Sequence, residues 1–150
     1  MKVNSLCHSS LEPDLRAFGE SLSRSLFCAL PGIVRAFDRA TQTVSVQPAV
    51  QDRLPDGTPV DFPLLTDVPV FFPGTKSSAI TWVVEPGDEC LVIFADRNID
   101  AWFTTGTSGP GDIPRAHSLS DGFAFVGFRS KPNALQNFPD EPSFFGGEPS

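Results

Sequence analysis

The stretch Ile80–Asp96, ITWVVEPGDECLVIFAD, decides how this chain folds. It contains two strand-like runs on either side of Glu85–Asp88. Pro86 presets φ for the second position of a turn, and Gly87 supplies the positive φ that a type II turn needs next. In the second run, successive side chains point to opposite faces of a sheet. The two alternating sets are Cys90, Val92 and Phe94 on one face, and Leu91, Ile93 and Ala95 on the other.

Both faces of this second run are apolar. A strand in a half-solvated antiparallel sheet would instead alternate apolar with polar residues. In a chain of 150 residues, one face can fill a small barrel. The other face then needs a helix, a loop or a partner subunit. The sequence therefore predicts assembly before it predicts any chemistry.

The composition is typical of a small, mainly β domain. Fifteen prolines and twelve glycines, with many Val, Thr and Phe residues, favour short strands and frequent turns. The length suffices for one domain with its own core. About five expected strands and one helix fit a small closed antiparallel barrel of the OB type. An open sandwich is the alternative.

The net charge of −7 argues against nucleic-acid binding, because contacts to phosphates need Lys and Arg. It also argues against docking on anionic lipid heads. The three cysteines show no CxxC spacing, so neither a disulfide framework nor a zinc site is expected. We expect no signal peptide and no membrane span.

The turn signals divide the β region into short segments. Asp38–Thr41 separates two arms of a hairpin, and Pro55-Asp56-Gly57 predicts the tip of a projecting loop. Pro69 would confine a third strand to an edge or a bulge. The expected strands lie at 33–37, 43–50, 64–72, 80–84, 89–95 and 123–128. A short helix capped by Asp96 is expected over 96–103.

Residues 11–30 are predicted to form a helix that ends at Leu30-Pro31-Gly32 and follows an extended arm at 1–10. Its apolar residues recur at intervals of three and four, which places them on one narrow stripe. They are Leu11, Leu15, Phe18, Leu22 and Leu26. The tail 131–150 has too few aliphatic residues for a core. Its Phe138, Phe144 and Phe145 are expected to dock on a surface or a partner.

No enzyme mechanism is predicted, and no metal or cofactor is expected. Ser118, His117 and Asp121 lie within five residues of one another, whereas the members of a catalytic triad converge from separated elements. A local hydrogen-bonded turn is the better interpretation. Four carboxylates near strand ends could suggest glycoside hydrolysis, but we expect them to cap turns and a short helix. They are Asp88, Glu89, Asp96 and Asp100.

Four ordered blocks carry a family resemblance over about residues 30–130. They are LPGIVRAFDRATQTVSVQPAV, LLTDVPVFFPG, ITWVVEPGDECLVIFADRNIDAWF and RAHSLSDGFAFVGF. In these blocks the chain resembles the N-terminal domain of the central membrane-piercing baseplate spikes of contractile-tailed bacteriophages. The resemblance implies an OB-fold whose three copies form a trimer that caps the tail tube at the hub.

The resemblance also implies a division of the chain into three parts. Residues 1–30 would attach to the hub, 31–130 would form the OB domain, and 131–150 would lie near the apex. Such spikes usually continue into a triple-stranded β-helix with a metal-bearing tip. The tail here has no histidine and no strand-like repeat, so we expect a shortened spike. A separate tip protein could complete it.

We therefore expect a structural virion protein, assembled in the host cytoplasm, that contacts the host envelope during contraction. The rival interpretation is an OB-type binding module for an oligosaccharide or a small ligand. The trimer interface candidates are Leu91, Ile93, Phe94 and Ala95, without a decision on which face is outward. The candidates for attachment to the hub or tail-tube terminator are Leu15, Phe18, Leu22 and Leu26.

Overall fold

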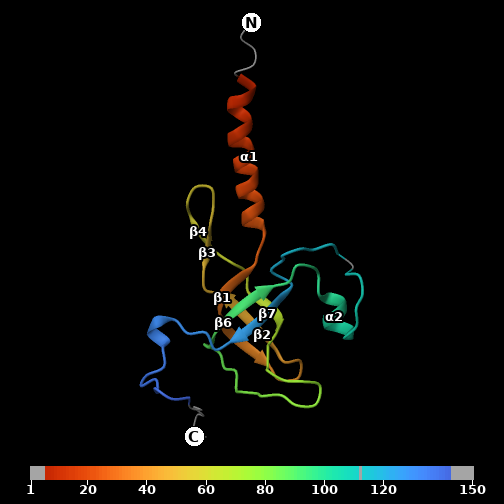
Figure 1. Cartoon of the computed structure of the whole chain (residues 1–150), viewed down its shortest axis with the longest axis vertical. Helices are drawn as coiled ribbons and strands as arrows, with labels where there is room; N and C mark the ends of the chain where they lie inside the picture. Colours follow the sequence, from red (N-terminus) through yellow and green to blue (C-terminus); the bar gives the residue numbers. More distant parts are fainter. Residues whose placement is uncertain (1–5, 112, 143–150) are drawn as a thin grey trace.

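A computed structural model describes residues 6–111 and 113–142 of the chain. It is mainly β, with a curled five-stranded antiparallel sheet and one long N-terminal helix (Figure 1). The sheet order is β5-β2-β1-β6-β7. Its strands are β1 (Ala29–Asp38), β2 (Thr43–Pro48), β5 (Leu65–Pro69), β6 (Glu89–Phe94) and β7 (Gly122–Val126).

Two of the predicted hairpins form, whereas the two arms expected around Glu85–Asp88 do not both become strands. The turn after Asp38 joins β1 to β2, and Pro55-Asp56-Gly57 lies at the tip of a separate hairpin made by β3 (Gln51–Arg53) and β4 (Pro59–Asp61). Strand β5 lies at the edge of the sheet, as Pro69 predicted, but it ends at Pro69 and does not continue to Phe72 as expected. Gly87 takes φ of 102° in the turn before β6, where the Asp88 amide donates to the Glu85 carbonyl.

The sheet curls, but a closed barrel is not confirmed. The two edge strands meet at one bridge, where Val70 faces Ala124 and the Phe71 amide donates to the Ala124 carbonyl at 2.9 Å. The concave face holds the core. The residues buried there are Val34, Val44, Val46, Leu65, Val68, Val84, Cys90, Val92, Phe94 and Ala124.

Helix α1 (Leu6–Ser25) begins and ends earlier than predicted. The expected arm lies partly within it, since residues 6–10 are helical, and residues 1–5 lie outside the described range. Strand β1 starts at Ala29, so Leu30-Pro31-Gly32 does not end a helix. Pro31 is tolerated in β1 because its backbone nitrogen and carbonyl point toward β2 and not toward β6. The pairing with β2 begins only at Gly32, and the Pro31 carbonyl accepts from the Ala49 amide, just beyond the end of β2.

Two other expectations about local structure are wrong. Residues 80–84 form no strand: only Val84 enters the core, and a single backbone bond, from the Ile80 amide to the Pro73 carbonyl, joins the segment to a neighbour. Helix α2 (Asp100–Thr105) starts four residues after Asp96, and Ile99 occupies its N-cap position. After β7, a short 3-10 helix covers Lys131–Asn133. Phe138 is 75% exposed, and Phe144 and Phe145 lie outside the described residues.

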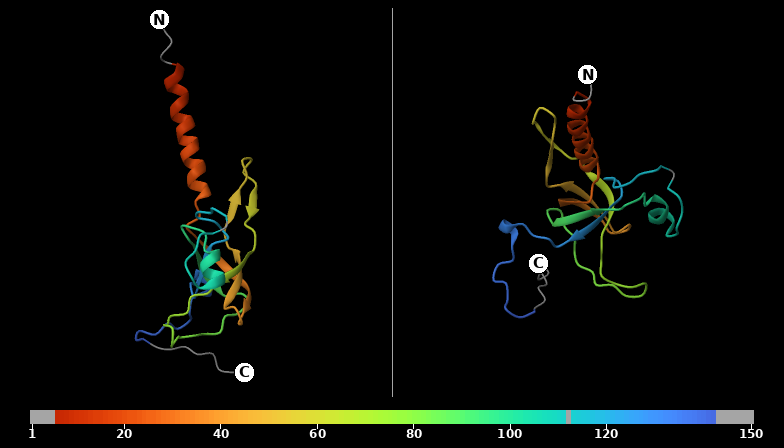
Figure 2. Two further views of the ribbon diagram at one scale, coloured as in Figure 1. Left: turned by 90° about the vertical axis from the view of Figure 1, so that its right-hand side faces the viewer. Right: turned by 45° about the horizontal axis from the view of Figure 1, so that its top comes forward.

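The elements give the molecule two distinct ends. Helix α1 and the β3–β4 hairpin project from one end of the sheet, and the tail leaves toward the other (Figures 1 and 2). No helix among the described residues combines the length and apolarity that crossing a membrane requires.

A candidate assembly surface on the sheet

Strand β6 divides its side chains between two environments. Cys90 and Val92 are each 1% exposed and Phe94 is 5% exposed, so these three face the core. Leu91 is half-buried, and Ile93 remains 40% exposed on the opposite face. The predicted strand with two apolar faces is therefore present. Only one of its faces is covered by the chain itself.

The register of the sheet extends this outward face into an apolar row. In β7, Phe125 lies opposite Leu91 and Phe123 lies opposite Ile93. In β1, Pro31 and Ala29 lie opposite the same two β6 residues. Directly opposed residues of paired strands place their side chains on the same face. The outward face is therefore continuous across three strands.

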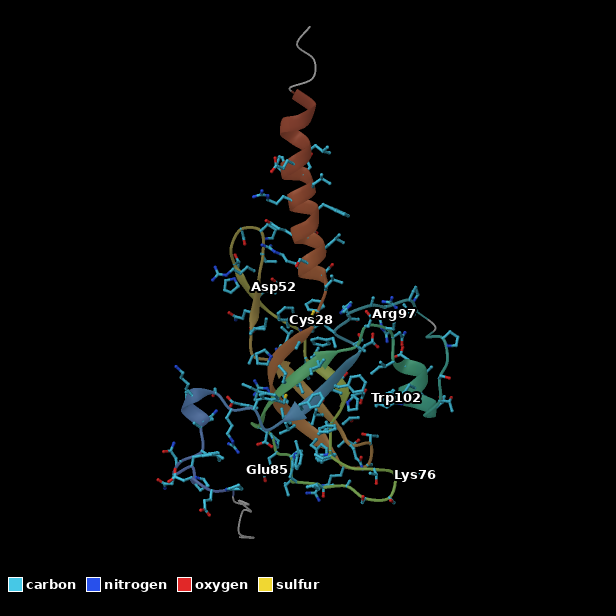
Figure 3. The ribbon with its side chains drawn as sticks, viewed as in Figure 1. Cys28, Asp52, Lys76, Glu85, Arg97 and Trp102 are labelled. Atoms are coloured by element: carbon cyan, nitrogen blue, oxygen red, sulfur yellow. The ribbon has the colours of Figure 1, made fainter. Side chains whose placement is uncertain are left out.

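Two aromatic residues from outside these strands widen the row. The Phe71 ring, which follows β5, lies 5.1 Å from the Phe125 ring. Trp102 of α2 lies between its helix and the sheet, with its ring 5.6 Å from Phe123 (Figure 3). We call this surface the outer sheet face. Its residues are Ala29, Pro31, Phe71, Leu91, Ile93, Trp102, Phe123 and Phe125.

The eight residues of the outer sheet face are apolar, and Phe71 and Trp102 are each about half exposed. Glu89, the next outward residue of β6, borders them and is hydrogen-bonded to Ser130 and Asn133. Contiguous apolar patches of this kind mark interaction sites on soluble proteins. The face holds Leu91 and Ile93 among the sequence candidates, while Ala95 is half-buried just past the end of β6. Phe94 does not belong to it, because the alternation of β6 turns this ring into the core.

Sequence reasoning missed six members of this surface, namely Ala29 and Pro31 of β1 and four aromatic residues. The alternation in GFAFV at 122–126 could have identified Phe123 and Phe125 as outward residues, because the small residues Gly122 and Ala124 alternate with them and face the core. Phe71 and Trp102 had no such signal. They join the surface only because a bridge and a helix bring distant segments against β7.

Helix α1 presents a second uncovered apolar surface. Every described side chain from 11 to 26 is exposed. The stripe residues are 55% exposed at Leu11, 60% at Leu15, 63% at Phe18, 49% at Leu22 and 50% at Leu26. The helix stands away from the sheet (Figure 3). The body of its own chain therefore does not cover the stripe.

A buried ion pair holds α2 beside the sheet. The Asp121 side chain is fully buried, and the Arg115 guanidinium donates to both of its oxygens, at 2.9 and 3.0 Å. Arg115 also donates to Asp100 at 2.8 Å, and the Ile99 amide donates to Asp121. Burial alone would raise the pKa of Asp121, but the bonds from Arg115 and Ile99 outweigh it and lower that pKa.

These contacts leave no Ser–His–Asp relay at this place. The His117 Nε2 atom lies 3.0 Å from Asp96, while Asp121 binds Arg115. The Ser118 hydroxyl accepts from the Ser120 amide. This is the local hydrogen-bonded turn that the spacing predicted.

The other singled-out acidic groups also have structural contacts. Asp88 accepts from the Glu85 amide within the turn. Glu89 accepts from Ser130, just before the tail, and from Asn133 within it. Burial, helped by the charge of Asp88, raises the pKa of the Cys90 thiol to about 11, so it stays protonated at neutral pH. Among the described side chains, no three His, Cys, Asp or Glu residues gather closely enough to hold a metal ion.

The comparison with protein families agrees with the resemblance seen in the sequence. A family model described as the phage protein Gp138 N-terminal domain matches residues 30–127, and no curated protein matches the chain. The matched residues contain nearly all of the five-stranded sheet and leave out α1 and the tail. The match supports a structural phage protein and a component of the virion. The chain belongs to the family of the phage protein Gp138 N-terminal domain.

Proposed function

We propose that this protein is the central spike of a phage baseplate, a homotrimer that caps the tail tube and helps to penetrate the host envelope during contraction. The outer sheet face is the observation that carries the proposal. It offers aromatic and aliphatic side chains without charge, the composition typical of interface cores. In a trimer with threefold rotational symmetry, the outer sheet face of each copy would be covered by a neighbouring copy.

Closed rotational assembly suits a surface of this shape. Strands β1, β6 and β7 present it as one curved sheet, so a neighbouring copy can bury it as a unit. Leu91 and Ile93 lie in the central strand of the three, with the aromatic residues of β7 beside them. In the trimer we expect these side chains to supply most of the burial, with Ala95 at the margin.

The two ends of the molecule suggest how the spike is oriented. Helix α1 and the β3–β4 hairpin project together from one end, and the tail lies toward the other (Figure 2). The α1 end would meet the hub or tail-tube terminator, with Leu15, Phe18, Leu22 and Leu26 contributing to attachment. The far end would face the host envelope, where a separate tip protein could complete the apex.

The proposed mechanism is mechanical. Sheath contraction drives the tube forward, and the trimer transmits that force before the channel opens. Stiffness would come from the hydrogen-bonded sheet and from the ion pair of Asp121 with Arg115, which holds α2 beside β7. Close-packed protein interiors have low compressibility and transmit strain.

An OB-type binding module for an oligosaccharide or a small ligand is the second candidate. One observation favours it, namely an open cavity of about 330 Å³ away from the outer sheet face. Its lining combines aromatic and polar groups, with the Phe72 ring 5.5 Å from Trp82 and with Arg39 and Gln42 nearby. Such a module would function as a monomer, so the oligomeric state separates the two candidates.

Two measurements test the proposal. Light scattering on the purified chain should give the mass of three copies, and a reconstruction of the intact particle should place three copies on the tail axis. A single copy within the assembled particle would exclude the homotrimeric spike. A monomer that binds oligosaccharide in the Phe72–Trp82 cavity would instead support the binding module.

A truncation tests the attachment role of α1. The deletion should end at residue 26, because Phe27 packs against Phe62 and Phe94, and the Cys28 carbonyl accepts from the Phe94 amide. We expect the remaining chain to fold and to trimerise but to be missing from particles. Normal incorporation of the truncated chain would refute an attachment role for α1.

A further inference from the structure

The apolar residues of α1 follow a spacing that suits helix–helix packing. The five stripe residues are separated by four, three, four and four residues. At about 100° per residue, Leu11 to Leu22 lie within an arc of roughly 60°, and Leu26 widens it to roughly 80°. A helix that lies on a broad surface carries a stripe at least about 100° wide, whereas an a/d stripe is the narrower coiled-coil seam.

The opposite face of α1 is suited to solvent. The charged residues Arg16, Glu20 and Arg24 project there, and Pro13 lies on the same side, away from the stripe. Each of the five stripe residues is at least 49% exposed. Nothing in the described part of this chain covers it, so its partner lies outside the single copy.

We propose that the three α1 helices of one spike pack together as a parallel three-stranded coiled coil on the trimer axis. In this arrangement Leu15 and Leu22 occupy a positions, and Leu11, Phe18 and Ser25 occupy d positions. The inference rests on the proposed homotrimer. It changes the direct contact of the stripe from the hub to the two sister helices.

The flanking positions permit a parallel arrangement. In a parallel coiled coil, a g residue lies opposite the e residue of the following heptad on the neighbouring helix. Asp14 at g is then opposite Gly19, and Ser21 at g is opposite Leu26. No like charges oppose each other, and Pro13 takes the outermost f position, where its ring points away from the bundle.

The connection between α1 and the sheet favours the same arrangement. Only residues 26–28 separate the helix from β1, whose first residue, Ala29, belongs to the outer sheet face. The link is fixed at its base, because the Phe27 amide donates to the His117 carbonyl and the Cys28 carbonyl accepts from Phe94. Sheets held around an axis would therefore raise the effective concentration of the three helices.

Paired cysteine variants of the full chain test this inference without any hub protein. Cys7 and Cys28 are changed to Ser, while Cys90 is retained because it is buried. Ser25→Cys then places a thiol at a d position, and Ser23→Cys places one on the solvent side as a matched control. Both original side chains are exposed, and neither substitution removes a residue of the stripe. Each variant is treated with a short bifunctional thiol reagent, and its mass is measured by light scattering.

We expect Ser25→Cys to cross-link at least roughly tenfold faster than Ser23→Cys, because the d positions meet on the axis. Equal, slow cross-linking in a chain that is trimeric by light scattering would overturn the coiled coil and leave the proposed spike intact. Monomers by light scattering would overturn both.

Discussion

The five-stranded sheet and helix α1 make opposite use of equally regular apolar patterns. Each core residue of the sheet is at most 5% exposed, whereas the stripe residues of α1 are 49–63% exposed. In α1 the period placed the apolar residues on one stripe, and in β6 it separated two apolar faces without deciding which one is outward. The difference teaches that periodicity shows which side chains need cover but not which chain supplies it.

The outer sheet face lies between these extremes. Ile93 is 40% exposed although its neighbour in sequence, Val92, is 1% exposed. A single strand therefore contains one face covered by its own chain and one left open. Such an open face argues for a partner as strongly as the stripe of α1 does.

The largest expected difference comes from placing the same charge in both regions. Val92→Asp buries an unpaired carboxylate in the core and should destabilise the chain by about 4 kcal/mol or more. Leu15→Asp should change the free energy of unfolding of the sheet by no more than about 0.5 kcal/mol, because Leu15 is 60% exposed on a helix that stands away from the sheet. Urea unfolding followed by tryptophan fluorescence, at a concentration where copies do not associate, measures both.

Equal losses for the two variants would contradict the comparison. They would mean that α1 packs on the sheet in solution and that its stripe is covered by its own chain.

Local sequence signals predicted much of the sheet. The turn at Glu85–Asp88, the hairpins at Asp38–Thr41 and Pro55–Gly57 and the edge position of Pro69 all follow from backbone preferences that act within a few residues. The two-faced character of β6 could also be predicted, because side chains alternate strictly along a strand.

The missed features depend on contacts between distant segments. Residues 80–84 have strand-like composition but do not join the five-stranded sheet, and only Val84 becomes buried. Phe71 and Phe125 are 54 positions apart and meet only because the sheet curls. The start of α2 at Asp100 likewise reflects Arg115, which ties Asp100 to Asp121.

The next effect concerns the buried ion pair at one side of the sheet. Asp121→Ala leaves Arg115 without its buried partner and should destabilise the chain by about 3 kcal/mol. The folded pKa of Asp121 is lowered, so its contribution is present above about pH 4, the pKa of an unfolded Asp, and is lost as the pH falls through the folded pKa.

Urea titrations of the wild type and the variant across the acid range measure this contribution. The variant should lose less stability than the wild type on acidification. A difference between the two that stays constant below pH 4 would show that Asp121 does not contribute through its charge.

A smaller effect on the single chain is expected at the outer sheet face. Ile93→Glu should change the stability of a monomer by no more than about 1 kcal/mol, since Ile93 is already 40% exposed. In the trimer the same change would bury three unpaired charges and should dissociate the copies. Ile80→Glu is the matched control, because Ile80 is 63% exposed and lies outside this face.

Light scattering and unfolding together separate these effects. Dissociation by Ile93→Glu but not by Ile80→Glu would support the outer sheet face as the interface. A trimer that survives Ile93→Glu would place the interface elsewhere.

The smallest effect concerns the start of the tail, which is tied to the sheet by polar contacts. Glu89 of β6 accepts from the amide and the hydroxyl of Ser130, each at 2.6 Å, and from Asn133 at 3.0 Å. The Ser130 hydroxyl contributes most to lowering the pKa of Glu89, followed by the Ser130 amide. The tie should therefore persist at neutral pH and be lost only as acidification protonates Glu89 below the ordinary range of a glutamate.

Trypsin provides a direct measurement of this tie, because it cleaves after Arg129, next to the bonded Ser130 amide. Glu89→Gln removes the carboxylate charge and should make cleavage there several-fold faster, with no change in the unfolding of the sheet. Glu85→Gln is the control, since it removes an equal charge from the preceding turn. If both variants are cut at the wild-type rate, Glu89 does not hold the tail. The tail would then resemble α1, a segment that its own sheet leaves free.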